Sequence, residues 1–279
     1  MLTAIAPVVW GTTYVVTTEF LPARRPLTTA ALRALPIGLL LLVVFRQLPK
    51  GEWWYRAAIL GALNIGFYFA LLFIGAYRLP GGVVAVVVAI QPLVVAFLAY
   101  FLLGENLAWM KIVAAILGMG GVSLIVLKPS AHLDTIGLAA VFAGTLMMAT
   151  ATVLLKRWGK LPVPPLVFTS WQLVFGGLML APAALIAEGI PSQMSATNVF
   201  GYIYLGVVGT GLAYALWFQG ISRLNVSTVV FLALLSPVMA VLIDVIFLGK
   251  WLSVLQITGV ILILCAIALA QKIPARDRV

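Results

Sequence analysis

Charged side chains are scarce in this sequence. They make up 9% of the 279 residues, whereas 64% of the residues are hydrophobic. Soluble proteins carry about 25% charged residues. A soluble core could not hide this much apolar surface, so we expect an integral membrane protein rather than a water-soluble one.

Cysteine and histidine are almost missing, since each occurs once, as Cys265 and His132. A single cysteine excludes an internal disulfide bond and a thiolate metal cluster. His132 lies in a predicted loop with no neighbours at metal-ligand spacing, which is typical of a solvated side chain. We therefore expect no metal site and no cofactor.

Residues that could carry out a reaction inside the apolar runs are also missing. No histidine lies in such a run, and no two carboxylates are placed at helical spacing on one face there. An intramembrane enzyme needs a nucleophile with its base, or a metal with its ligands. We therefore expect that the protein is not an enzyme.

Long polar stretches are absent too. The longest one between apolar runs extends from about residue 188 to residue 198. The chain opens almost directly on an apolar segment, with no basic leader and no Ala-x-Ala cleavage site. We expect neither a soluble domain nor a cleaved signal peptide.

The sequence does contain ten apolar runs of about 20 residues, the length that a helix needs to cross a bilayer core about 30 Å thick. Because open sheet edges do not survive in lipid, runs that are apolar on every side are expected to be helices. The sequence predicts an all-α integral membrane protein with ten transmembrane helices. The predicted helices cover residues 4–21, 26–45, 54–77, 80–103, 107–127, 136–156, 164–187, 199–221, 226–248 and 251–271.

Basic residues are distributed unequally between the two sides of this predicted topology. Eleven Lys and Arg residues lie on the side that holds both termini and five on the opposite side, with Arg33 inside a run. Cytoplasmic loops are enriched in Lys and Arg, so we expect a multi-pass protein of the inner, cytoplasmic membrane with both termini in the cytoplasm. The net charge of +10 raises nucleic-acid binding as an alternative, but basic residues in short loops indicate membrane orientation instead.

The chain is similar to itself when it is shifted by 145 residues. Identical residues under this shift include Arg78-Leu79 and Arg223-Leu224, Pro92 and Pro237, Gly104 and Gly249, Gly61 and Gly206, Gly66 and Gly211, and Gly75 and Gly220. The duplication predicts two five-helix repeats, residues 1–130 and 131–279. Because five is odd, the second repeat enters the membrane from the opposite side, an inverted arrangement that suits alternating access.

Inverted duplication within one chain argues against a channel, which we expect to show a selectivity segment and oligomeric symmetry.

Several motifs accompany this pattern. They are Trp10-Gly11, Arg33, Gly104-Glu105, Trp171-Gln172 and Pro237. With ten spans and the repeat, they make the chain resemble the drug/metabolite transporter superfamily, in particular its ten-helix members built from two EamA-type repeats. Its aromatic content is most similar to that of the YddG-type exporters of amino acids and aromatic compounds. The second repeat departs from the pattern, since Gly249-Lys250 stands where the first has Gly104-Glu105.

The resemblance implies an inner-membrane carrier that exports small metabolites, most simply aromatic or neutral amino acids and related aromatic compounds. Its partners would be the small-molecule substrate and the lipid bilayer, without nucleic acid, and it is expected to be monomeric. Efflux of several drugs or aromatic cations remains an alternative. A sugar-phosphate or nucleotide-sugar carrier would show Lys or Arg deep in several spans, whereas here only Arg33 qualifies.

Pro92 and Pro237 are predicted to act as hinges. A proline removes a backbone hydrogen bond and kinks a helix, and each lies near the middle of its predicted span, at the repeat-equivalent position. Interrupted helices in corresponding positions of two halves indicate a midplane binding site. A fixed kink without substrate contact is the structural alternative.

Polar and aromatic residues deep in the spans are the candidate substrate ligands. We expect them to line a cavity between the repeats, although packing alone also explains aromatic residues in a helix bundle. The candidates are Trp10, Tyr14, Asn64, Tyr68, Gln91, Trp171, Gln172, Thr210, Tyr214 and Ser236.

Three ionisable residues also lie in the predicted spans, in the outer half of the membrane. They are Glu19, Arg33 and Asp244. Buried ions are tolerated when they are paired, so Arg33 is expected to pair with Glu19 or Asp244. The functional alternative is an outer gate or a proton-responsive carboxylate.

Overall fold

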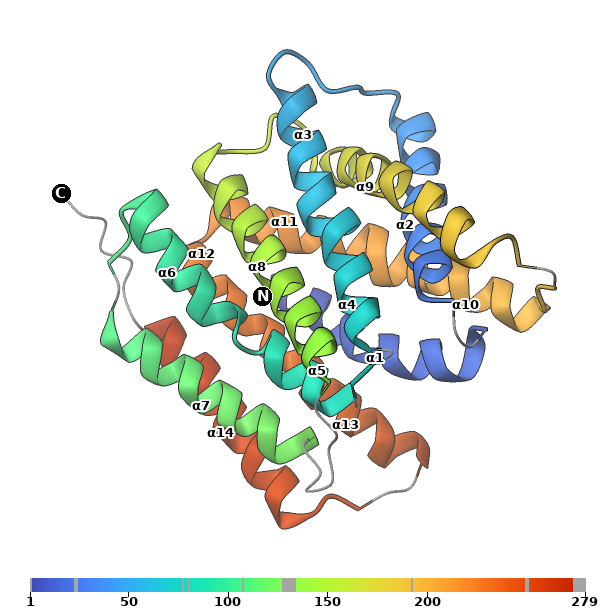
Figure 1. The fold of residues 1–279 in the computed structure, drawn as a ribbon. Coiled ribbons are helices and arrows are strands. Elements are labelled where there is room, and N and C mark those ends of the chain that lie inside the picture. The colour runs from blue at the N-terminus through green and yellow to red at the C-terminus, as the bar shows by residue number, and fades with distance from the viewer. Residues whose placement is uncertain are drawn as a thin grey trace.

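The computed structural model describes residues 2–22, 25–76, 78–79, 81–106, 108–126, 134–191, 193–248 and 251–272 (Figure 1). Its regular secondary structure within these ranges is helical. His132 and Gly249-Lys250 lie outside the described residues, as do the side chains of Tyr14 and Asp244. The predicted all-α fold class is confirmed.

The first half of the chain contains five predicted spans. Its elements are η1 (Leu2–Ala4), α1 (Ile5–Phe20), α2 (Pro26–Phe45), α3 (Trp53–Gly61), η2 (Ala62–Phe67), α4 (Tyr68–Ala76), α5 (Gly81–Val88), α6 (Gln91–Leu103) and α7 (Trp109–Val126). The third span is thus one helix whose middle turn, η2, is a π-helix, and the fourth span is divided between α5 and α6.

The second half repeats this plan. Its elements are α8 (Thr135–Arg157), α9 (Pro165–Glu188), α10 (Ala196–Gly206), η3 (Val207–Leu212), α11 (Ala213–Arg223), α12 (Val226–Val229), η4 (Val230–Leu234), α13 (Leu235–Leu248) and α14 (Val254–Lys272). Its third span contains the π-helix η3, and its fourth span is interrupted by the 3-10 turn η4.

Helix length and composition agree with a protein that spans a membrane. In the described ranges, 8 helical segments are long and apolar enough to cross a bilayer. Two shorter apolar segments, Leu2–Thr17 and Val230–Ile243, fall in the first and ninth predicted runs. Each predicted run therefore corresponds to one helical segment, either continuous or interrupted.

Two helix pairs make the most extensive contacts, α2 with α9 and α7 with α14. Figure 1 shows α7 and α14 side by side along one edge of the bundle. They cross at glycines: a Cβ on Gly121 would lie 2.7 Å from the Gly259 carbonyl oxygen, and one on Gly259 would lie 2.6 Å from that of Gly121. Small residues allow such close backbone approach between helices in lipid. Both pairs join helices that correspond under the 145-residue shift.

The two π-helices also correspond under that shift, since Ala62–Phe67 moved by 145 residues becomes Val207–Leu212. Each follows a glycine that lies against the central α2–α9 pair. A Cβ on Gly61 would lie 2.7 Å from the Gln172 carbonyl oxygen, and one on Gly206 would lie 2.7 Å from Cγ1 of Ile37. These glycines let each π-helix approach the central pair closely.

Candidate substrate-binding site

The fourth and ninth spans break where the sequence places its paired prolines. Pro92 is the second residue of α6 and is buried, and Pro237 is the third residue of α13, directly after the 3-10 turn η4. A proline has no N–H to donate to a carbonyl of the preceding turn. Both prolines therefore begin a new half-helix, instead of bending a continuous one.

Polar groups lie beside both breaks. Gln91 is 3% exposed, and in the described part of the chain its Nε2 has no hydrogen-bond partner. Ser236 precedes Pro237 and is partly exposed. Its carbonyl oxygen would lie 2.7 Å from a Cβ on Gly11, so this break packs directly against the Trp10-Gly11 segment of α1.

The π-helix η2 carries a buried polar contact to α9. Asn64 Nδ2 donates to Gln172 Oε1 at 2.7 Å, and both side chains are at most 1% exposed. Gln172 Nε2 has no partner among the described residues. A buried amide without a full set of partners is costly in an apolar environment, so this pair has spare hydrogen-bonding capacity at mid-span depth.

The π-helix η3 carries the corresponding contact to α2. Arg33 Nε donates to Thr210 Oγ1 at 2.9 Å, and Arg33 Nη2 lies 3.4 Å from the Gly209 carbonyl oxygen. The guanidinium carbon lies 4.7 Å from the centre of the Phe69 ring. Each π-helix is thus held by a polar side-chain contact to the central helix of the opposite half.

An aromatic cluster surrounds η3. Trp10 Nε1 donates to the Gly209 carbonyl oxygen at 3.1 Å, and the Trp10 ring lies 5.1 Å from Tyr214 and 5.2 Å from Trp217. Phe69 lies 6.3 Å from Tyr214. Residues from α1, α4 and α11 therefore meet the guanidinium of Arg33 in one place.

The charged residues of the predicted gate do not all meet. In the described chain, the contacts of Arg33 are with Thr210, Gly209 and Phe69, and Tyr214 and Tyr68 interact with it electrostatically. Glu19 is exposed near the end of α1 and is not among these contacts. Arg33 is instead held by neutral groups, because α2 packs against η3 and α9. The Asp244 side chain lies outside the described residues.

Trp171 lies apart from this cluster. Its Nε1 donates to the Gln47 carbonyl oxygen at 2.7 Å, in the segment that follows α2, and its ring packs against Phe168. The side chain is 3% exposed. Trp171 therefore ties the start of α9 to the end of α2.

Sequence reasoning missed the π-helices and the role of Gly209. In a π-helix the backbone bonds run from residue i to i+5, which frees carbonyl groups for side-chain donors; the Gly209 carbonyl oxygen accepts from Trp10 and lies close to Arg33. The available signal was the repeated glycine spacing: Gly61 and Gly206 directly precede the two π-helices, and Gly66 and Gly211 lie within them.

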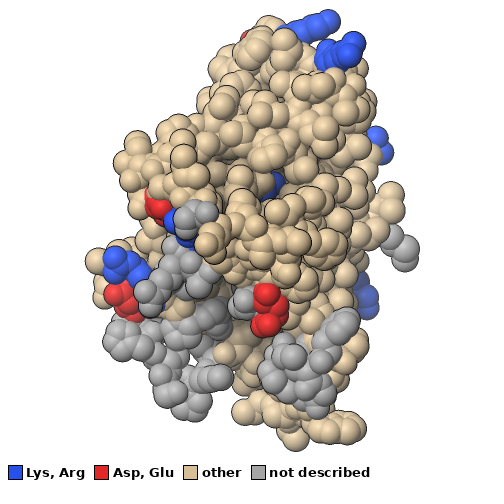
Figure 2. Space-filling model, turned by 90° about the vertical axis from the view of Figure 1, so that its right-hand side faces the viewer, with Lys and Arg blue, Asp and Glu red and all other residues tan. Residues whose placement is uncertain are grey.

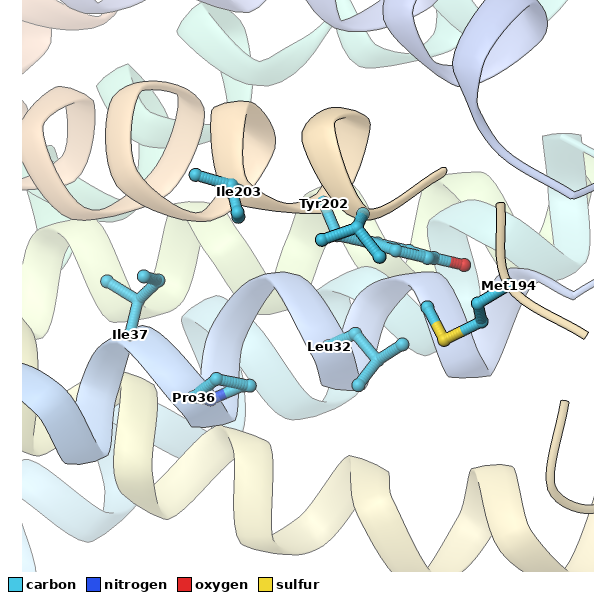
Figure 3. A pocket seen from close by; sticks show the side chains of 7 residues that line it. Leu32, Pro36, Ile37, Met194, Tyr202 and Ile203 are labelled. Atoms are coloured by element: carbon cyan, nitrogen blue, oxygen red, sulfur yellow. The ribbon is translucent and has the colours of Figure 1, made fainter. Parts of the chain in front are cut away.

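Two apolar cavities flank this region. One, of about 160 Å³, lies between α2 and α10 (Figure 3), where Leu32, Pro36 and Ile37 face Tyr202 and Ile203. The other, of about 420 Å³, is lined by residues of α1, the end of α2, the start of α9, η3 and α11. Both cavities have mainly apolar walls. Neither is lined by the polar pairs Arg33–Thr210 and Asn64–Gln172.

The profile of the EamA-like transporter family matches residues 1–127 and again residues 135–271. The chain belongs to the EamA-like transporter family. The predicted membership in the drug/metabolite transporter superfamily is confirmed, and this EamA protein is a multi-pass membrane transporter of small metabolites. The family and the names of its relatives point to a transporter rather than to an enzyme.

Individual relatives cover nearly the whole chain. Protein PecM of Dickeya dadantii is 44% identical over 274 residues, which cover 98% of this chain and 92% of the relative. A probable amino-acid metabolite efflux pump of Salmonella typhimurium is 26% identical, covering 95% of this chain and 92% of the relative. A solved crystal structure has a TM-score of 0.82 at 20% identity and covers 97% of both chains, which supports the fold alone.

Proposed function

We propose that this EamA protein is an inner-membrane carrier that exports aromatic or neutral amino acids and related aromatic compounds. The observations that carry the proposal are the buried contacts at the two π-helices. Asn64 bonds to Gln172 at η2, and Arg33, Thr210 and the rings of Trp10 and Tyr214 lie together at η3. Such groups suit a small ligand with an apolar body and a few hydrogen-bonding atoms. The amino-acid metabolite efflux pump among its relatives supports the same substrate class.

The carrier works by alternating access between two inverted repeats, residues 1–130 and 131–279. The common register of the π-helices and of the broken spans supports this division. So does the pairing of corresponding helices, α2 with α9 and α7 with α14. Rocking of one repeat against the other then exposes a site between them to each side in turn.

The proposed substrate ligands are those of the cluster and of the helix breaks. They are Trp10, Tyr14, Asn64, Tyr68, Gln91, Gln172, Thr210, Tyr214 and Ser236, with Trp171 at the cytoplasmic end of the pathway. Pro92 and Pro237 would let the half-helices move, because a break has no continuous hydrogen-bond ladder to resist bending. Glu19 and Asp244 belong to the outer gate.

The proposed orientation places both termini in the cytoplasm, on the excess of Lys and Arg in the loops of that side. The protein acts as a monomer in this proposal, since a single chain supplies both repeats. Its partners are the substrate and the bilayer.

Two other substrate classes fit the cluster less well. Export of aromatic cations would bring a positive charge towards the buried Arg33, which no described acid contacts, and like charges repel strongly at low dielectric. Sugar phosphates carry about two negative charges and are bound by several cations. Arg33 is the single basic residue in the middle of the predicted spans.

Counterflow in proteoliposomes tests the proposal. Vesicles loaded with unlabelled phenylalanine, methionine or threonine should take up the same labelled amino acid transiently above equilibrium, because a carrier exchanges substrate across alternating states. Repeating the assay with a proton gradient would separate coupled from passive exchange. If folded protein exchanges none of the three, the amino-acid assignment is wrong; uptake without overshoot would indicate a channel.

A further inference from the structure

Arg33 carries a positive charge that no described group balances. Its side chain is 6% exposed, and its contacts in the described chain are a hydroxyl, a carbonyl and an aromatic ring. The guanidinium has five N–H donors, of which Nε and one on Nη2 are used. Nη1 donates to no described group.

An unbalanced cation in the membrane interior is unfavourable and usually marks a ligand pathway. The contacts of Arg33 stabilise it only in part, because neutral acceptors and a ring face are weaker than an ion pair. An anion that approaches Nη1 would supply the missing charge. We infer that Arg33 binds the carboxylate group of the transported substrate, an inference that rests on the proposed function and assigns its substrates a chemical class.

The surroundings of Arg33 favour a single carboxylate on an aromatic or apolar body. One buried cation balances one negative charge, and a guanidinium matches a carboxylate in a two-point hydrogen bond. Phe69, Trp10 and Tyr214 lie around it at ring separations of 5.1 and 6.3 Å, which provides stacking surface for the rest of the ligand. A phosphate monoester would leave about one negative charge uncompensated there.

The Arg33 side chain is not completely enclosed by the protein. Figure 2 shows that most of the described surface on this face is uncharged, with basic and acidic side chains gathered at a few places. Arg33 retains a small exposed fraction, as a binding group requires. Buried polar groups normally have hydrogen-bond partners, and Nη1 of Arg33 has none among the described residues.

Titration calorimetry on the purified full-length protein in detergent tests the inference with matched pairs of ligands. The pairs are phenylalanine with phenylalaninamide, and 3-phenylpropionate with 3-phenylpropionamide, together with phenyl phosphate. The variants are Arg33→Gln, Arg33→Lys and, as a matched loss of charge at an exposed site, Arg157→Gln.

We expect the wild type to bind each acid at least about 30-fold more tightly than its amide, the scale of a buried charged hydrogen-bonded pair. Arg157→Gln should keep this preference, Arg33→Gln should abolish it, and Arg33→Lys should restore part of it. Equal affinity for acid and amide in the wild type would overturn the inference without any variant. So would an acid preference that survives Arg33→Gln, the absence of acid binding, or tighter binding of phenyl phosphate.

The two proposals can fail separately. Arg33-dependent acid binding without counterflow would support the carboxylate site and contradict the carrier function. Counterflow of acid and amide at equal affinity would support the carrier and contradict the role of Arg33.

Discussion

At the scale of single residues, several buried side chains in the spans have hydrogen-bonding capacity that is not fully used. Asn64 and Gln172 bond to each other, and Gln172 Nε2 and Gln91 Nε2 have no described partner. Burying a polar side chain in the membrane interior costs free energy, so such residues usually have a functional role. The sequence identified these residues because amides stand out in apolar runs, but it did not show which of them meet.

The Asn64–Gln172 bond provides a stability prediction. Asn64→Leu should lower the free energy of unfolding by about 1–3 kcal/mol, because it leaves both polar atoms of Gln172 unpaired. Adding Gln172→Leu should restore most of the loss, since no buried polar group then remains. Unfolding midpoints of the four proteins in detergent form the double-mutant cycle. Additive losses in the double variant would show that the two side chains do not interact.

At the scale of elements, the two halves share interruptions at the same positions: a π-helix in the third span and a break in the fourth. Proline positions predicted the breaks, because proline has no N–H to donate. The π-helices were not predictable from hydrophobic periodicity, since one widened turn leaves the apolar character of the span unchanged. The glycines before them lie close to α9 and α2. That need for a small residue becomes visible only when the neighbouring helices are known.

The break at Pro237 leads to a kinetic prediction. Pro237→Ala should slow counterflow more than it weakens substrate binding, because alanine allows the backbone bond that closes the break between η4 and α13 and stiffens the half-helix. Pro182→Ala, within the regular helix α9, is the control and should leave the exchange rate nearly unchanged. Equal losses of rate and affinity in Pro237→Ala would indicate an altered site geometry instead of a hinge.

At the scale of the whole molecule, the two halves are joined through pairs of corresponding helices. The α7–α14 pair crosses at Gly121 and Gly259, where each glycine faces the backbone carbonyl of the other. This contact joins the two helices that lie along one edge of the bundle (Figure 1). Its geometry follows from close backbone approach, which in lipid replaces the hydrophobic effect as the driving force for association.

Gly121 therefore allows a matched test of this contact. Gly121→Ala should destabilise the protein by about 1–3 kcal/mol, because its methyl group would lie 2.7 Å from the Gly259 carbonyl oxygen and force the helices apart. Gly120→Ala, one residue earlier, meets nothing within 4 Å and should be neutral or slightly stabilising. Thermal unfolding in detergent measures both, and equal midpoints would contradict the proposed crossing.

The sequence by itself determined that the protein lies in a lipid bilayer, that it is helical, where its ten apolar runs are and to which family it belongs. These properties depend on composition, run length and recurring motifs, which are local or periodic along the chain. It also singled out Arg33, Thr210 and Tyr214 as candidates, since polar and aromatic residues at mid-span depth are unusual.

Only the tertiary structure decided which of those residues meet. Arg33 was expected to pair with an acid, but the packing of α2 against η3 places it between Thr210, Gly209 and Phe69. Trp171 was grouped with the deep aromatic residues, but its hydrogen bond to Gln47 places it at the end of α2. The physical reason is that contacts between spans depend on helix rotation and crossing. Side-chain packing sets both, and a uniformly apolar helix gives no face preference from which to read them.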